Sequence, residues 1–367
     1  MPERNTMKKI QELQQVKGDA YDYYIAGNED TDLFEKIFLV DDIVEEICKP
    51  DKYFLIGEKG SGKTAYSVYM SKSDKINSFC SISLVENTLY QRFLNMKRQK
   101  ALELSSFKDV WINLIYLILA EKIRKEYGET FFSSIKYKQL SKAIDVFYSD
   151  AFKPEFVNAF EFVDNASASI NSMMKQGLFS TGTKASAETS QKYVEQSFQI
   201  SLLKIRDGFE KAFMSVNLKK PTILFVDGID ARPRDIDNEQ YFECLVGLVN
   251  AVLEMNQSFL KEKQIKIMLL IRPDIMYKMP VHNMNQKLRN NSVLLNWVTS
   301  YRKYIDSKLF KIADDYFMKQ QDYSYELGEC WNYYFPYKVE YQEKWKAPDN
   351  PFVEFLRYSL YKPRDIL

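Results

Sequence analysis

Apolar runs of strand length alternate with helical patterns along much of the chain. The runs are Tyr53 to Ile56, Ser78 to Leu84, Thr222 to Val226 and Ile265 to Ile271, with a weaker one at Ser292 to Leu295. Helical patterns follow the first run at Lys63 to Met70 and the third at Asn238 to Met255. This alternation predicts an α/β fold with a parallel sheet.

The rest of the chain is patterned mostly as helix. Helices are predicted at Thr6 to Val16, Thr31 to Cys48, Tyr301 to Ala313 and Phe352 to Leu360. The block from Asn87 to Asn217 is also mostly helical, but Asn165 to Gln191 is rich in Ser, Ala, Thr and Gly and predicts a mobile loop or loose hairpin. Because this block separates the second and third strands, we expect it to be an insertion on the α/β core.

These patterns divide the chain into four predicted parts. They are an N-terminal helical segment (residues 1–50), an α/β core (51–85 plus 218–298), a mostly helical insertion (86–217, with its mobile loop at 165–191) and a C-terminal helical lid (299–367). A length of 367 residues has room for two ordinary domains or one large domain with an insertion. Hydrophobic residues at 46% and charged residues at 28% suit a soluble globular protein.

Charge and targeting signals narrow the possible partners. With 51 basic and 50 acidic side chains, the net charge of +1 predicts no general attraction to nucleic acid or anionic lipid, although a local patch can exist. The most apolar run, Val110 to Ala120, is shorter than the ~20 residues that cross a bilayer, so we expect a buried helix and no membrane contact. Without a signal peptide, and with four widely spaced cysteines expected as buried thiols, the sequence predicts a cytoplasmic protein.

The segment from Gly57 to Thr64, GEKGSGKT, has the spacing of a phosphate-binding P-loop between a predicted strand and a predicted helix. Its glycines let successive backbone N–H groups face one anion, and the helix that follows adds further donors and a positive dipole end. Lys63 is expected to reach the β- and γ-phosphates of ATP, and the Thr64 hydroxyl to ligate Mg²⁺. The predicted nucleotide-binding residues are Gly57, Glu58, Lys59, Gly60, Ser61, Gly62, Lys63, Thr64 and Ala65.

A second element is the apolar strand that ends in Asp227, a carboxylate suited to hold Mg²⁺ directly or through water. Where the commonest pattern has a glutamate that activates water, this chain has Gly228. The nearest carboxylate beyond it is Asp230, which we predict orients the attacking water. The alternative is that Asp230 caps the following turn.

A third element is Arg272, which follows the apolar run from Ile265 to Ile271. In P-loop folds of the additional-strand (ASCE) type, such a strand lies between the P-loop strand and the metal-aspartate strand. Arg272 would then sense the γ-phosphate or stabilise charge in the transition state. A surface arginine at a strand end is the alternative. The predicted fold is thus an ASCE-type P-loop NTPase sheet with a large helical insertion and a C-terminal helical lid.

With these elements placed, the sequence resembles the STAND and AAA+ side of the P-loop superfamily. The run Asp227-Gly228-Ile229-Asp230 is similar to the DGxD form of STAND ATPases, and Ile271-Arg272-Pro273 to their sensor strand. More narrowly, the motifs resemble a family of bacterial P-loop ATPases, also called FunZ-like, often found beside phage-defence and mobile-element genes. The segments that carry this resemblance are GEKGSGKTA, FVDGIDARP, LLIRPDI, LNW and YKPRDIL.

The resemblance also implies a role for the C-terminal Pro363-Arg364-Asp365, which is similar to a sensor-2 element. Arg364 would reach the nucleotide from the helical lid and couple its phosphate state to the position of the lid. Only three residues follow Arg364, and the family pattern usually continues as a helix. We therefore expect the lid to be either truncated or completed by another chain.

The leading hypothesis is a slow or regulated ATPase that works as a switch, controlling its assembly as a homo-oligomer or the action of a partner protein, in defence against phage. A DNA-acting ATPase is the first alternative, with basic clusters at Lys97 to Lys100, Lys122 to Lys125 and Lys136 to Lys138. The second alternative is a small-molecule or nucleotide kinase, which the long aromatic insertion fits poorly. A nucleotide-binding scaffold that does not hydrolyse stays open because no glutamate follows Asp227.

Overall fold

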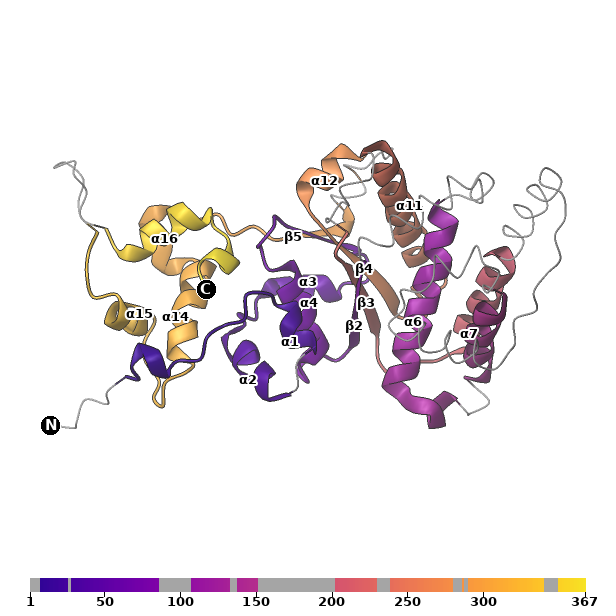
Figure 1. Cartoon of the computed structure of the whole chain (residues 1–367), viewed down its shortest axis with the longest axis horizontal. Helices are drawn as coiled ribbons and strands as arrows, with labels where there is room; N and C mark the ends of the chain where they lie inside the picture. Colours follow the sequence, from indigo (N-terminus) through magenta and orange to yellow (C-terminus); the bar gives the residue numbers. More distant parts are fainter. Residues whose placement is uncertain are drawn as a thin grey trace, which may run out of the picture. The chain divides into compact units, whose positions relative to one another are not determined.

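The computed structural model describes residues 7–25, 28–85, 107–132, 137–150, 202–229, 238–279, 286, 290–339 and 349–367. The chain divides into two compact units, both drawn in Figure 1. The terminal unit contains Met1–Ile76 and Ser292–Leu367, and the central unit contains Asn77–Asn291.

The central unit is built on three parallel strands, β2 (Phe79–Leu84), β3 (Thr222–Asp227) and β4 (Ile265–Ile271), with β3 paired to both neighbours. Every residue of β3 and β4 is buried, as expected of strands that are mostly apolar. The side chain of Asn256 pairs with the backbone N–H and C=O of Ile267, which ties the helix before β4 to the strand itself.

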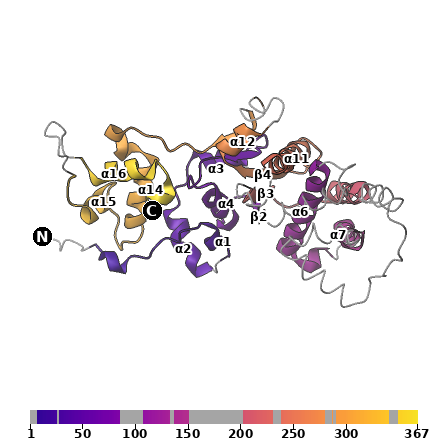
Figure 2. The ribbon, with the colours of Figure 1, turned by 45° about the horizontal axis from the view of Figure 1, so that its top comes forward.

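Helices form successive layers beside these strands (Figures 1 and 2). The helix α11 (Asn238–Asn256) packs against β4, α6 (Phe107–Phe132) packs against α11, and α7 (Lys138–Asp150) packs against α6. A further helix spans residues 202–215. The apolar run from Val110 to Ala120 lies within α6 and is buried, which confirms the predicted buried helix. None of the helices in the described ranges combines the length and the apolar character needed to cross a bilayer.

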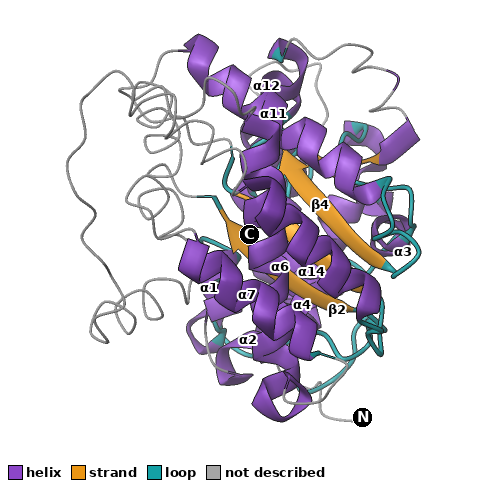
Figure 3. Cartoon of the chain, turned by 90° about the vertical axis from the view of Figure 1, so that its right-hand side faces the viewer, coloured by secondary structure: helices purple, strands orange, loops and turns teal. Residues whose placement is uncertain are grey.

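The terminal unit brings together both ends of the chain. The strand β1 (Phe54–Ile56) pairs in parallel with β5 (Ser292–Leu294). Among the described residues of the amino-terminal part, three α-helices precede β1 in the chain, and a fourth follows it. These are α1 (Tyr21–Ile25), α2 (Asn28–Ile37), α3 (Asp42–Cys48) and α4 (Lys63–Lys72). Figure 3 shows these helices in purple and the strands in orange.

After β5 the chain forms a group of short helices with a largely aromatic core. They are η2 (Tyr301–Asp306), α14 (Lys308–Met318), α15 (Glu329–Tyr334), α16 (Pro351–Ser359) and η3 (Pro363–Asp365). Phe310, Trp331 and Phe352 pack together in this core, and Leu13 from the amino-terminal segment joins them. We call η2 to η3 the C-terminal module.

The predicted α/β class with parallel strands is confirmed, since all five strands pair in parallel, and β4 has the predicted bounds. The helix predicted at Thr6 to Val16 is wrong. In the described part of that segment only η1 (Ile10–Glu12) is helical, because the backbone of Lys8 and Gln14 bonds to glutamine side chains after α14 instead. The predicted loop from Asn165 to Gln191 lies outside the described residues.

Two predicted helices are each divided in the structure. The helix predicted from Thr31 to Cys48 ends at Ile37, and α3 begins again after Asp41, whose carboxylate accepts from Ile43 N at 3.1 Å. The helix predicted from Tyr301 divides at Ser307, whose Oγ accepts from Phe310 N. Capping side chains therefore start new helices inside continuous apolar patterns.

The predicted burial of the cysteines holds for three of the four: Cys80, Cys244 and Cys330 are buried, whereas Cys48 is exposed.

Candidate phosphate-binding site

The loop from Gly57 to Gly62 lies between β1 and α4 in the terminal unit. Gly60 and Gly62 have φ of 83° and 91°, in the left-handed region that side chains other than glycine rarely adopt. Gly62 is also the residue before the first turn of α4, and no side chain caps that turn. The sequence therefore needs its glycines here to turn the backbone directly into a helix.

Gly57 is required by close packing rather than by its φ angle. A Cβ at Gly57 would lie 2.2 Å from Ser61 Oγ and 3.1 Å from Leu295 Cβ, so the loop closes over this position. Ser61 is 3% exposed, and its Oγ has no hydrogen-bond partner within the described part of the chain. A buried hydroxyl with donor capacity to spare suits a site that receives oxygen-rich ligands.

Lys63 is 8% exposed and folds back over the loop. Its Nζ donates to the carbonyl oxygens of Gly57 at 2.8 Å and of Glu58 at 3.2 Å. A buried ammonium is costly unless it is hydrogen-bonded, and the loop carbonyls meet that need. The result is a cation held against the loop backbone at the start of a helix.

The loop also presents backbone donors. The N–H of Ser61 donates to Glu58 O at 3.1 Å, whereas those of Lys59, Gly60 and Gly62 donate to no acceptor among the described residues. Spare amide donors, the positive end of α4 and a buried lysine together form an arrangement that stabilises an anion. These residues fit a phosphate chain.

Two residues of the C-terminal segment reach this loop. The indole N–H of Trp297 donates to Ser61 O at 2.9 Å, and the backbone N–H of Arg364 lies 3.4 Å from Gly60 O. The Arg364 guanidinium lies 3.4 Å from the position of a Cβ at Gly60. The structure thus places Arg364 beside the loop, and its role at a nucleotide stays a prediction. Trp297 was not among the predicted site residues, and only its place in the LNW motif pointed to it.

Asp41 joins three helices of the terminal unit. Its carboxylate accepts from Tyr66 of α4 at 3.0 Å and from Lys308 of α14 at 2.7 Å, in addition to capping α3. Burial and the Asp41 charge raise the pKa of Tyr66 well above its ordinary value, so the phenol stays protonated and donates. Burial opposes the charge on Lys308, but hydrogen bonds to Asp41 and Asp42 outweigh it and raise the pKa.

In the central unit, Asp227 ends β3 and is 8% exposed. Its Oδ1 accepts from the N–H of Gly228 at 2.7 Å, and its backbone oxygen accepts from Val85 N at 2.8 Å. Gly228 has φ of 83°, and a Cβ there would lie 3.0 Å from Val85 O. The glycine in place of the expected glutamate is therefore required by the turn. Asp230 lies outside the described residues.

Arg272 is the residue directly before α12 (Pro273–Lys278), a helix that the sequence patterns did not predict, and its side chain does not cap that helix. Its guanidinium binds Asp274 through two hydrogen bonds of 2.9 and 2.7 Å. The arginine is therefore paired within its own turn. Its predicted role at the γ-phosphate stays a prediction.

The basic clusters weighed for nucleic acid are only partly described. Arg124 pairs with Glu121 at 2.6 Å, and Tyr137 is buried and donates to Asn217 O. Lys97 to Lys100 and Lys136 lie outside the described residues. In the described part of these clusters, the side chains of Arg124 and Tyr137 therefore already bond to other groups of the protein.

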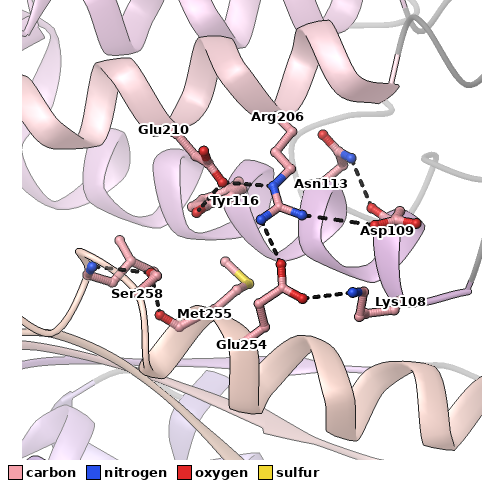
Figure 4. Close-up of polar contacts among 10 residues, drawn as sticks. Lys108, Asp109, Asn113, Tyr116, Arg206, Glu210, Glu254, Met255 and Ser258 are labelled. Atoms are coloured by element: carbon pink, nitrogen blue, oxygen red, sulfur yellow. Dashed lines mark hydrogen bonds and ion pairs between the residues drawn. The ribbon is translucent and has the colours of Figure 1, made fainter.

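A different cluster of charges joins three helices of the central unit (Figure 4). Arg206 binds Glu210 and Glu254 at 2.7 Å each, and Lys108 binds Glu254 at 2.8 Å. Burial opposes the charge on Glu254, but hydrogen bonds from Lys108 and Arg206 outweigh it and lower the pKa. We call Lys108, Arg206, Glu210 and Glu254 the Arg206 network.

No group of three or more His, Cys, Asp or Glu side chains able to hold a metal occurs among the described residues. Mg²⁺ does not need such a group, because it is commonly held by one or two protein ligands together with phosphate oxygens.

No protein-family model matches this chain, and comparison with curated proteins and with solved structures finds no match either. The assignment of the site therefore depends on its residues and their geometry.

Proposed function

We propose that the chain binds the phosphate groups of Mg-ATP at the loop from Gly57 to Thr64 and hydrolyses ATP slowly, as a switch. The single observation that carries this proposal is the loop itself. It combines two left-handed glycines, spare amide donors and the buried Lys63 ammonium at the start of α4. A polyphosphate is one of few ligands that can use the loop amides, the helix start and the ammonium together.

In this proposal Lys63 exchanges the carbonyls of Gly57 and Glu58 for phosphate oxygens, because a charged acceptor forms the stronger hydrogen bond. Arg364 supplies a second cation beside Gly60. From the sequence motifs, Thr64 and Asp227 would hold Mg²⁺, and the ion would neutralise charge on the phosphates. Asp230 orients the attacking water and Arg272 meets charge at the γ-phosphate, and both of these roles derive from the sequence motifs.

The proposal of a switch is supported by the contacts between the loop and the C-terminal module. Trp297 and Arg364 both contact loop carbonyls, so a change in the loop on binding or hydrolysis alters contacts on the segment that leads into the module and on η3 at its end. Assembly with further copies or with a partner protein, and a role in phage defence, come from the resemblance to STAND and FunZ-like ATPases.

The test measures phosphate release and particle mass by light scattering, each with and without Mg-ATP. We expect slow release by the parent protein, and loss of release in Lys63→Ala and Asp227→Asn. Asp230→Ala separates a hydrolysing switch from a scaffold, since equal rates would remove Asp230 from the mechanism. An ATP-dependent increase in mass that Lys63→Ala abolishes supports the switch, and a mass that ATP leaves unchanged argues against it.

A further inference from the structure

Trp297 holds a position that its role in packing alone does not explain. It lies just beyond β5, at the start of the segment that leads to the C-terminal module, and its ring packs against the core of that module. Its indole N–H nevertheless donates outside that core, to Ser61 O in the P-loop at 2.9 Å. One side chain therefore contacts both the module and the loop.

The contact sets the orientation of one peptide group. No peptide bond in the described chain is cis, and in a trans peptide the C=O and the N–H point in opposite directions. Because Ser61 O faces Trp297, the N–H of Gly62 in the same peptide group faces away from Trp297. That N–H is one of the loop donors without an acceptor among the described residues.

Gly62 cannot hold this orientation by itself. Its φ of 91° is open to glycine, but glycine also has many other accessible conformations, so the peptide group before it is free to rotate unless something fixes it. The only side-chain hydrogen bond to Ser61 O among the described residues is that from Trp297. The loop glycines therefore need an external partner to present their donors in one direction.

From these observations we propose that Trp297 is a positioning residue for phosphate: its indole N–H orients the Ser61–Gly62 peptide so that Gly62 N–H faces the anion. The proposal rests on the proposed function and identifies the part of the ligand that Trp297 serves. Because the effect acts on a backbone donor, it concerns the polyphosphate chain and not the base or the sugar. Trp297 also links that donor to the C-terminal module.

The experiment compares Trp297→Phe with Trp331→Phe by calorimetry, using Mg-ATP and inorganic tripolyphosphate as ligands. Both variants lose one indole N–H hydrogen bond, but that of Trp331 goes to Asn350 within the C-terminal module at 3.1 Å. We expect Trp297→Phe to bind both ligands about fivefold more weakly, the effect of one hydrogen bond, and Trp331→Phe to bind them as the parent does. Melting temperatures show that each variant is folded, and Trp297→Tyr is a second variant without the indole N–H.

A second readout does not depend on nucleotide. Amide hydrogen exchange in residues 57–64 without ligand should be faster in Trp297→Phe and unchanged in Trp331→Phe. If the parent binds ATP and Trp297→Phe binds both ligands equally well, the inference is overturned. If the parent binds neither ligand, the proposed function fails, and the exchange data then decide the inference alone: faster exchange supports the orientation by Trp297, and unchanged exchange overturns it.

Discussion

The terminal and central units use their polar groups in different ways. In the central unit the Arg206 network joins the side chains of three helices, and each charge has a partner of opposite sign. In the terminal unit the contacts of Lys63, Trp297 and Arg364 converge on backbone oxygens of one loop. Pairs between side chains stabilise a scaffold, whereas contacts that orient backbone groups leave donors available for a ligand. We therefore expect substitutions in the Arg206 network to change stability, and those around the loop to change affinity.

The largest expected effect is that of Lys63→Ala on ATP affinity. Removal of the ammonium takes away a charged donor to phosphate, for which a loss of about 100-fold is the expected scale. We expect a smaller effect on stability, because the bonds from Lys63 to Gly57 and Glu58 lie within the loop. Titration calorimetry and thermal unfolding measure the two quantities. A variant that binds ATP as the parent does would remove the loop from the proposed site.

Gly228→Ala tests an expected effect on stability, and not on affinity, in the central unit. The substituted Cβ would lie 3.0 Å from Val85 O at a φ of 83°, and we expect a loss of about 2 kcal/mol in the free energy of unfolding. Gly208→Ala is the matched control, since its Cβ would have no neighbour within 4 Å. The control should be neutral or stabilising, because alanine favours a helix. Equal effects of the two substitutions in denaturant unfolding would contradict the tight turn after Asp227.

Glu254→Gln tests whether the stability contributed by the Arg206 network depends on pH. The folded state lowers the pKa of Glu254, so its stabilising effect is present above the unfolded pKa of about 4.3 and is lost as pH falls through the lower folded value. We expect a loss of about 1 kcal/mol at pH 7, since the side chain is 35% exposed and solvent screens it. The difference from the parent should vanish at acid pH.

The exposed Glu262 provides the control, because Glu262→Gln changes the same side-chain type on the surface outside the network. Its unfolding curve should follow that of the parent from neutral to acid pH. A loss at pH 7 that persists undiminished in acid would show that Glu254→Gln acts through packing and not through the Arg206 network.

The smallest expected effect is that of Lys308→Met in the terminal unit. Lys308 binds Asp41 at 2.7 Å, but its side chain is 43% exposed, so we expect a loss of about 0.5 kcal/mol in stability. High salt should reduce the loss. Lys311→Met, an exposed position on the same helix, is the control and should be neutral. A loss in the Lys308 variant that salt leaves unaltered would exclude an electrostatic cause.

Local features of the chain could be predicted well from the sequence. The bounds of β4 follow from a mostly apolar run, and the left-handed turns at Gly60 and Gly62 follow from the spacing of the loop glycines, because both depend on neighbours in the chain. The break at Asp41 was missed because apolar residues continue on both sides of it, and only the capping bond marks a new helix.

Contacts between distant residues could not be predicted in this way. Trp297 and Ser61 are 236 positions apart, and no periodicity relates an indole to a particular carbonyl. The same holds for Arg206 and Glu254, which meet only because their helices pack together. Arg364 was expected near the nucleotide because of the family resemblance, and the pattern of residues around it gave no such indication.

The central claim is that backbone amides of the loop bind phosphate, and selective ¹⁵N-glycine labelling tests it most directly. The chain has 12 glycines, so the amide spectrum is simple enough to assign with single substitutions. On addition of Mg-ATP we predict large downfield shifts of the Gly60 and Gly62 signals, with Gly247 and Gly328 unmoved. Unmoved Gly60 and Gly62 signals at an ATP concentration that saturates the protein would contradict the account.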